Sequence, residues 1–224
     1  MHRREFTVAV LAITALQGAH AAGVLTEGDA AAGVRAALER GANAAVALLG
    51  RSDGFLGNAL VRIGLPGHLQ DAAKLMRTLG QGKKVDELVT GMNRAAEMAV
   101  PKAQPLLVNA VKGISVEDAV KLVRGSSTSV TAFFADKTRT PLSGLFLPDV
   151  TRATDKLELA RRYNAVAGKS VGLGLVKPED ASIQKYVTRR ALDGLFLMIG
   201  EEEKKIRSNP LQTGSDLLKK VFGR

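Results

Sequence analysis

Two carboxylates near the C-terminus have the residue type and the spacing that acid and base catalysis needs. Glu202 lies four residues after Met198 and four before Ile206, so on a helix it shares a face with both. This spacing predicts that Glu202 points inward, while Glu201 and Glu203 reach solvent. Carboxylates held in a cleft can act as general acid and general base, which is the chemistry that a hydrolase uses.

Asp193 is the second carboxylate of this segment, and it lies in the most apolar part. It follows Arg189 by four residues and Arg190 by three, so both arginines can reach it on a helix. A carboxylate-dependent hydrolase built on Glu202 and Asp193 is therefore one hypothesis. It requires both groups in one cleft that is open to solvent.

Both carboxylates need partners, because a buried charge strongly destabilises the fold unless it is paired. Arg62, Arg94 and Lys102 are the partners that we expect. Asn93 and Glu97 lie beside Arg94 at the edge of a helical stripe and are predicted to join the same network. The network either fixes how helices pack or forms the polar floor of a ligand pocket. Its predicted members are Asp53, Arg62, Asn93, Arg94, Glu97, Arg189, Arg190, Asp193 and Glu202.

Residue types give little support to other catalytic or metal-binding chemistries. The chain has no cysteine, which excludes disulfides, thiol catalysis and thiolate metal sites. His68 is the one histidine after residue 21, and no serine near it has the pattern of a nucleophile elbow. Residues 80–84 lack the spacing of a phosphate-binding loop, and residues 53–58 offer too few oxygen ligands for calcium. We therefore expect no catalytic residues, no metal and no cofactor.

The element that must position the two carboxylates is residues 186–209. Its first half is apolar on nearly every side, and a helix of this kind must be enclosed by other elements. Its second half, EEEKKIR, predicts that the helix leaves the core and ends in solvent before Asn209-Pro210. Residues 178–180, Pro-Glu-Asp, are predicted to form its first turn.

Helical periodicity accounts for most of the remaining chain, and no stretch alternates long enough to predict a strand. An apolar loop, residues 51–69, is expected to be pinned against the core. Pro141 and Pro148 are expected to cut their region into short pieces. The predicted fold class is all-α, a single compact domain of about seven to nine helices of uneven length around the apolar C-terminal helix. The predicted helices are 29–49, 69–79, 84–100, 106–111, 115–125, 130–137, 154–168, 178–209 and 215–223.

Residues 1–21 have the pattern of a secretory signal peptide. Charged residues are followed by an apolar run, residues 6–16, and by Ala19-His20-Ala21, which has small residues where signal peptidase reads the chain. The run is shorter than the roughly 20 residues that span a bilayer. We expect cleavage near Ala21, a periplasmic or secreted domain of residues 22–224, and no transmembrane segment in that domain. The alternative is that residues 6–16 form a retained anchor or a core helix.

The domain is basic, which bears on its partners. The formal charge is +10, and removing residues 1–21 takes away two arginines and one glutamate, which leaves 30 basic and 21 acidic residues, or +9. In an export compartment this charge favours an anionic envelope component or an acidic protein partner, although it could serve solubility alone. Nucleic acid is not an expected partner in that compartment, and the chain has no tryptophan for stacking.

Three separated stretches are familiar: DGFLGNALVRIGLP at 53–66, MNRAAEMAVPKAQPLLVNAV at 92–111 and ALDGLFLMIGEEEKKIRSNP at 191–210. Together with LLKKVFG near the end, they resemble a bacterial family of exported proteins known as domain of unknown function 4197. The resemblance implies an all-helical domain, and it implies no activity and no catalytic residues. The chain departs from the family at Gly64, where proline is expected, and at Gly200, where alanine is expected. Glycine at 200 weakens its helix by roughly 1 kcal/mol.

These observations favour a non-enzymatic exported protein that binds an apolar or anionic envelope ligand or a protein partner. The hydrolase described above is one alternative, and a purely structural envelope factor is another.

Overall fold

A computed structural model describes residues 26–172 and 176–223, and this part of the chain contains nine α-helices, four short 3-10 helices and no strand. The predicted all-α class is confirmed. The predicted signal peptide, residues 1–21, lies outside the described residues. The α-helices are α1 Glu27–Leu49, α2 Gln70–Thr78, α3 Gly82–Ala99, α4 Ala103–Lys112, α5 Val116–Val123, α6 Ser129–Thr154, α7 Glu158–Gly172, α8 Ile183–Ser208 and α9 Asp216–Phe222. The 3-10 helices are η1 Gly67–Leu69, η2 Val100–Lys102, η3 Pro178–Asp180 and η4 Pro210–Thr213.

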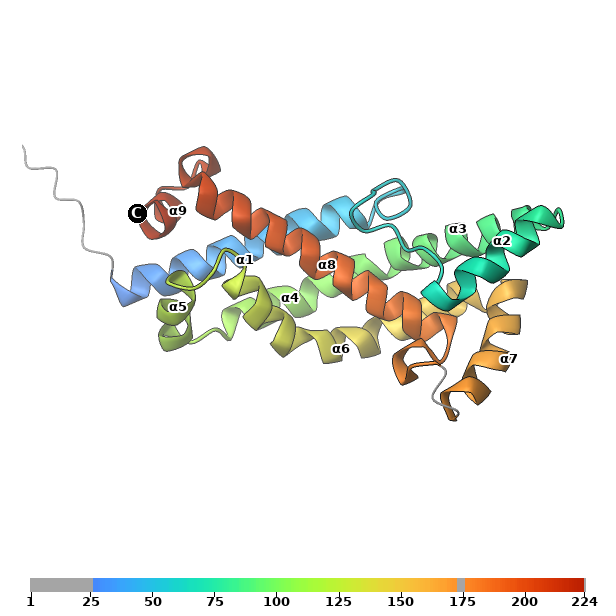
Figure 1. Cartoon of the computed structure of the whole chain (residues 1–224). Helices are drawn as coiled ribbons and strands as arrows, with labels where there is room; N and C mark the ends of the chain where they lie inside the picture. Colours follow the sequence, from blue (N-terminus) through green and yellow to red (C-terminus); the bar gives the residue numbers. More distant parts are fainter. Residues whose placement is uncertain (1–25, 173–175, 224) are drawn as a thin grey trace, which may run out of the picture.

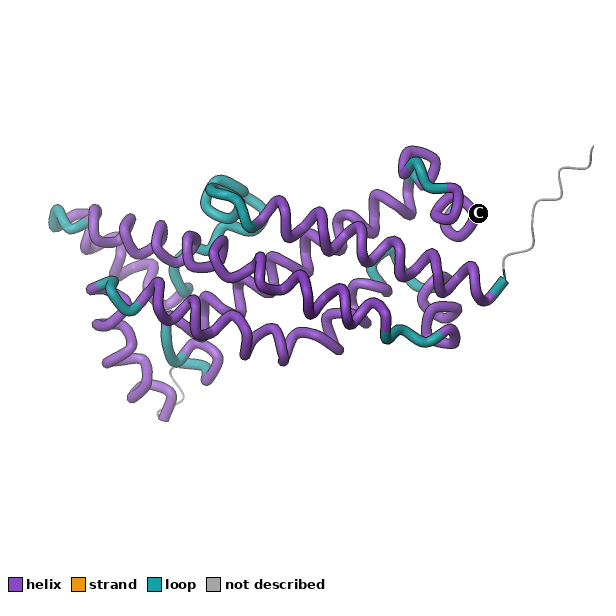
Figure 2. Tube along the Cα trace, turned by 180° about the vertical axis from the view of Figure 1, so that it is seen from behind, coloured by secondary structure: helices purple, strands orange, loops and turns teal. Residues whose placement is uncertain are grey.

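The helices form one elongated bundle (Figure 1). Helix α8 runs across the middle and packs on both α6 and α1, while α3 and α4 cover the other side of α6. The view from behind shows α1 and α8 side by side along the length of the bundle (Figure 2). Helices α5 and α9 lie at one end beside the start of α1, and α2 and α7 lie at the other end against α3.

Helix α8 is the enclosed helix that the sequence predicts. Leu192, Leu195 and Ile199 are buried at the contacts with α1 and α6. Burying a side chain of this size contributes about 2 kcal/mol or more relative to leaving it exposed. The helix begins later than predicted, because the hydroxyl of Ser182 accepts from the Lys185 backbone N–H and caps the N-terminus, so residues 178–180 form the separate helix η3.

The expectation that two prolines cut residues 129–154 into short pieces is wrong, because α6 runs unbroken through both. A proline leaves the carbonyl four residues earlier without its helical partner, here those of Lys137 and Gly144. Both prolines, Pro141 and Pro148, and both of these residues are exposed, so water can reach the carbonyls. On the opposite face, residues such as Phe146 are fully buried and hold the helix against the core. Packing against the core therefore outweighs the tendency of the two prolines to break the helix.

The loop between α1 and η1 is pinned to the core, as predicted. Phe55, Val61 and Ile63 are buried in it, although Leu60 is exposed. Phe55 and Val61 lie directly over Gly194 of α8, where an added methyl carbon would come within 2.8 Å of the Phe55 ring. The absence of a side chain at 194 therefore lets the loop approach the central helix closely.

Two glycines of α8 should respond in opposite ways to alanine. A methyl group at Gly200 would meet Thr128 at 3.6 Å and Thr131 at 3.7 Å, which is ordinary contact. Gly200→Ala should therefore raise the free energy of unfolding by about 1 kcal/mol through helix propensity. Gly194→Ala should lower it by roughly 1–3 kcal/mol, because the loop must move. Urea denaturation followed by far-ultraviolet circular dichroism measures both, and a Gly194→Ala protein as stable as the Gly200→Ala protein would contradict the loop packing.

Candidate functional site

The predicted polar residues of α3 bind the pinned loop. Asn93 is fully buried, and its Oδ1 accepts from the backbone N–H of Ile63 at 2.8 Å. Its Nδ2 donates to the carbonyl of the same residue at 2.8 Å and to that of Val89 at 2.7 Å. One amide therefore satisfies both backbone groups of a buried loop residue, which would otherwise be left without partners.

Glu97 binds the backbone of the first half of the loop. Its Oε1 accepts from the backbone N–H groups of Phe55 at 3.0 Å and Leu56 at 3.1 Å. Its Oε2 pairs with Arg94 at 2.6 Å, and Arg94 also pairs with Asp53 at 2.8 Å. Asp53, Arg94 and Glu97 thus form one network, and Asn93, one helical turn before Glu97, binds the same loop separately.

Two predicted partners of the α8 carboxylates lie elsewhere. Arg62 is exposed on the loop, where it adds to the lowering of the pKa of Asp86 that the hydrogen bond from Arg77 mainly causes. Lys102 pairs with Asp149 of α6 at 2.5 Å. The prediction that Arg62, Arg94 and Lys102 neutralise Glu202 and Asp193 is therefore wrong.

Asp193 instead faces arginines, and one of them comes from α6. Its Oδ1 accepts from Arg139 at 2.8 Å, and its other oxygen lies 3.6 Å from Arg189 and 3.8 Å from Arg190. The side chain is about one-third exposed, so the expected full burial is wrong. Arg189 and Arg190 were predicted to reach Asp193, and the structure places them there, while Arg189 also donates to Asp180 at 2.7 Å.

Glu202 lies apart from Asp193. It is partly exposed and pairs with Lys205 at 2.6 Å. Nine residues of helix separate the two carboxylates, which places them about 13 Å apart along the axis and on opposite sides of α8. Glu202 lines a shallow polar hollow with Arg40 that does not include Asp193. The hypothesis of a hydrolase that uses both carboxylates in one cleft is therefore wrong.

The buried carboxylate of this segment is Glu203, which was expected to reach solvent. It lies four residues after Ile199 and three before Ile206, and these buried residues set the inward face of α8. Its carboxylate accepts from the backbone N–H groups of Val130 at 3.2 Å and Thr131 at 2.8 Å, and from the Thr131 hydroxyl at 2.7 Å. Glu203 thus supplies the acceptors that the first turn of α6 lacks.

Arg207 completes this arrangement. Its Nε donates to Glu203 at 2.9 Å, and its Nη atoms donate to the carbonyls of Val123 at 3.0 Å and Leu122 at 2.9 Å. These carbonyls end α5. One ion pair on α8 therefore satisfies the C-terminus of α5 and the N-terminus of α6.

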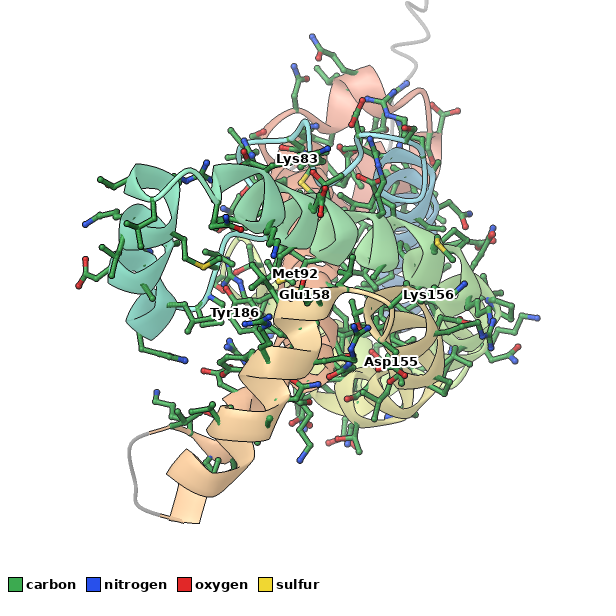
Figure 3. All side chains as sticks on the ribbon, turned by 90° about the vertical axis from the view of Figure 1, so that its right-hand side faces the viewer. Lys83, Met92, Asp155, Lys156, Glu158 and Tyr186 are labelled. Atoms are coloured by element: carbon green, nitrogen blue, oxygen red, sulfur yellow. The ribbon has the colours of Figure 1, made fainter. Side chains whose placement is uncertain are left out.

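A cavity of about 320 Å³ opens between α2, α3 and α7. Its walls are almost wholly apolar, with Leu69 and Met76 from α2 and the segment before it, Leu88 from α3, and Leu159 from α7. Arg162 is the charged residue among those that line it. Figure 3 looks onto this end of the molecule, where α7 runs down from below α3, with α2 to one side. No local sequence pattern indicates this cavity, because its walls come from segments that are far apart in the chain.

Tyr163 lies in the wall of the cavity and ties α7 to η3. Its ring stacks on that of His68 with 5.8 Å between centroids, and its hydroxyl donates to the carbonyl of Asp180. Burial raises the pKa of the Tyr163 phenol to about 12. Nearby, the Tyr186 hydroxyl donates to the carbonyl of Gly64 at 2.9 Å, which fixes the segment before His68 to α8.

A polar chain holds α7 to the start of α8. Asn164 accepts from the backbone N–H of Ile183 at 2.9 Å and donates to Gln184 at 2.8 Å, which in turn donates to Asp155 at 2.8 Å. Glu158, labelled in Figure 3, joins the start of α7 to Lys84 of α3 at 3.4 Å. These contacts set the position of α7 and therefore the width of the cavity.

Fold and site together define an all-helical protein with an apolar cavity at one end of its bundle. The chain belongs to the family described as Protein of unknown function (DUF4197), whose family model matches residues 24–223. This confirms the family that the sequence resembles. No curated protein and no solved structure matched the chain.

The described residues offer neither a metal site nor a membrane-spanning helix. Within 26–172 and 176–223, no group of three or more histidine, cysteine, aspartate or glutamate residues is placed to hold a metal ion. Within the same ranges, no helix has the length and apolar character needed to cross a membrane.

Breaking the pair at the α5–α6 junction should destabilise the protein strongly. Glu203→Gln leaves Arg207 largely buried without its counter-ion, and we expect a loss of about 3–5 kcal/mol in the free energy of unfolding. Glu202→Gln is the matched control, since its partner Lys205 is exposed, and we expect a change below about 1 kcal/mol. Urea denaturation distinguishes the two, and equal losses would contradict the assigned role of Glu203.

Tyr163 should make the protein sensitive to alkali. The pKa of its phenol rises from 10.0 to about 12 on folding, so the folded state favours the protonated form. The resulting stability is fully present below pH 10 and is lost as the pH rises from 10 toward 12. The chain has two tyrosines and no tryptophan, so near-ultraviolet absorbance follows the tyrosinates directly. In Tyr163→Phe the later of the two titration steps should disappear; its persistence would contradict the assignment.

Proposed function

We propose that the protein is an exported, non-enzymatic binding protein that takes the apolar chain of an anionic amphiphile into the cavity between α2, α3 and α7. The observation that carries the proposal is the almost wholly apolar lining of a cavity that is open to solvent. Apolar surface in contact with water is unfavourable, so a ligand that covers it gains free energy.

The size of the cavity supports a single chain. Its volume of about 320 Å³ is at the lower end of the range for small-molecule sites. Each methylene group that moves from water into such a site contributes about 0.8 kcal/mol, which is roughly a fourfold gain in affinity. Affinity should therefore grow with chain length until the cavity is filled.

Charge supports an anionic head group. Arg162 stands at the edge of the cavity with its side chain 70% exposed, and its present partner is Glu158 at 2.6 Å. An exposed pair of this kind is weak, so Arg162 can also meet a ligand carboxylate or phosphate. The formal charge of residues 22–224, 30 basic minus 21 acidic residues or +9, attracts anions over longer distances.

The pattern of residues 1–21 supports export, since it is typical of a cleaved signal peptide. The family match begins at residue 24, just after the predicted cleavage point. An envelope compartment contains membrane lipids and their breakdown products, which are anionic amphiphiles.

Titration with dodecanoate tests the proposal, with octanoate and dodecanol as comparisons, each below its aggregation concentration. Isothermal calorimetry should show saturable binding, weaker for octanoate by more than tenfold because four methylenes are missing. Dodecanol should bind more weakly than dodecanoate because it lacks the charge. No saturable binding of dodecanoate would refute the proposal.

A substitution that fills the cavity provides the structural control. Ala72 of α2 lines the cavity and is exposed, so Ala72→Phe should occupy the space without disturbing the core and should reduce dodecanoate affinity at least tenfold. Ala47 is also exposed but lies on α1, away from the cavity, so Ala47→Phe should bind as the unmodified protein does. Equal binding by the two variants would place the ligand elsewhere.

A further inference from the structure

A second cleft lies between α6 and α8, beside η3, and no residue of the apolar cavity lines it. Its volume is about 630 Å³. Leu147 and Leu192 give it apolar walls, and much of the rest of its lining is basic and hydroxyl side chains, together with one carboxylate. This mixture differs from the cavity at the end of the bundle, where polar groups are nearly absent.

Three cations line the cleft. Arg139 comes from α6, while Lys185 and Arg189 come from α8. Lys185 forms no ion pair with any described residue. Arg189 donates to Asp180 through Nη2, but its Nε is buried without a hydrogen-bond partner. Two donors of α8, the Lys185 ammonium and the Arg189 Nε, therefore remain free to bind an anion.

Three carboxylates limit the charge of the site. Glu179 lines the cleft and is exposed at its edge. Asp180 and Asp193 each accept one N–H of an arginine, from Arg189 and Arg139 respectively. Each of these arginines keeps further N–H donors, because a guanidinium carries five.

Thr188 is the observation that points to a ligand. Its side chain is only 2% exposed and lines the cleft, yet its Oγ1 has no hydrogen-bond partner. The other buried threonines among the described helices all have a partner: Thr138 donates to the carbonyl of Phe134 and Thr154 to that of Val150, while Thr131 donates to Glu203, each at 2.7 Å. A buried hydroxyl without a partner destabilises a protein, so such groups are rare, and a bound molecule that accepts from the hydroxyl is one explanation for them.

We propose that this cleft binds a small organic anion, a molecule in which a phosphate or carboxylate group is attached to a compact apolar body. The Thr188 hydroxyl and the free donors of Lys185 and Arg189 bind the anionic oxygens. The side chains of Leu147 and Leu192 contact the apolar body. Two ligand sites of different chemistry then occupy one chain.

Phenyl phosphate is the probe, with inorganic phosphate and phenol as its two halves. Calorimetry on the full purified chain should show phenyl phosphate binding at least tenfold more tightly than either half, with an affinity that falls as salt is added. Benzoate should also bind if a carboxylate serves as well as a phosphate. Inorganic phosphate that binds as tightly as phenyl phosphate, or no binding of phenyl phosphate, would overturn the proposal.

Substitutions in the cleft separate a binding role from a structural one. Thr188→Val removes the hydroxyl at constant shape, so the melting temperature should stay the same or rise while phenyl phosphate affinity falls at least fivefold. Thr188→Ser keeps the hydroxyl and should keep the affinity. Lys185→Gln should weaken binding to a similar extent, whereas Arg62→Gln, which removes an exposed cation elsewhere, should not.

The same measurements distinguish this cleft from the apolar cavity. Ala72→Phe should leave phenyl phosphate binding unchanged, and Thr188→Val should leave dodecanoate binding unchanged. Either site can therefore fail its test without affecting the other. Phenyl phosphate affinity that is equal in Thr188→Val, Lys185→Gln and the unmodified protein would overturn the assignment of this cleft.

Discussion

The junction between α5 and α6, and with it the way these helices pack on α8, depends on the ion pair between Glu203 and Arg207. Chain reversal between α5 and α6 leaves carbonyls at one helix end and N–H groups at the other, and both ends are packed against α8. Backbone groups buried without partners would strongly destabilise this junction. A carboxylate and a guanidinium one helical turn apart provide acceptors and donors together, and each also neutralises the other. The last two turns of α8 thus fix where α5 ends and where α6 begins.

A similar arrangement recurs in the C-terminal half of α3, where side chains bind backbone groups of a loop that has no regular backbone pairing. Asn93 and Glu97 bind the backbone of the loop that follows α1, and that loop covers α8 at Gly194. The loop is therefore part of the core and not a mobile connection. Polar residues that first suggested a site serve this purpose, which explains why Asp53, Asn93, Arg94 and Glu97 are close together and yet line neither cleft.

Much of the fold can be predicted from the sequence, because helix caps and apolar periodicity are local. The start of α5 at Ser115 and the enclosure of α8 follow from such signals. Which face of α8 points inward could not be predicted so simply, because Met198 and Ile199 are both buried. Counting four residues from Met198 predicts that Glu202 is buried, whereas counting four from Ile199 gives Glu203, which is the buried one. The continuity of α6, the apolar cavity and the cleft between α6 and α8 depend on contacts between segments that are far apart in the chain. No local sequence pattern therefore predicts them. Arg189, Arg190 and Asp193 were correctly grouped because helical spacing alone brings them together.

The two ends of the described chain meet at one end of the bundle. Lys220 of α9 pairs with Asp29 of α1 at 2.6 Å, and Val221 packs against Gly33. The apolar cavity lies at the far end, between α2, α3 and α7 (Figure 1). An attachment made at either end of the described chain would therefore lie at the end of the bundle opposite the cavity. Tethering the protein to a bead, a sensor chip or a neighbouring domain by these residues would leave the cavity facing outward and accessible.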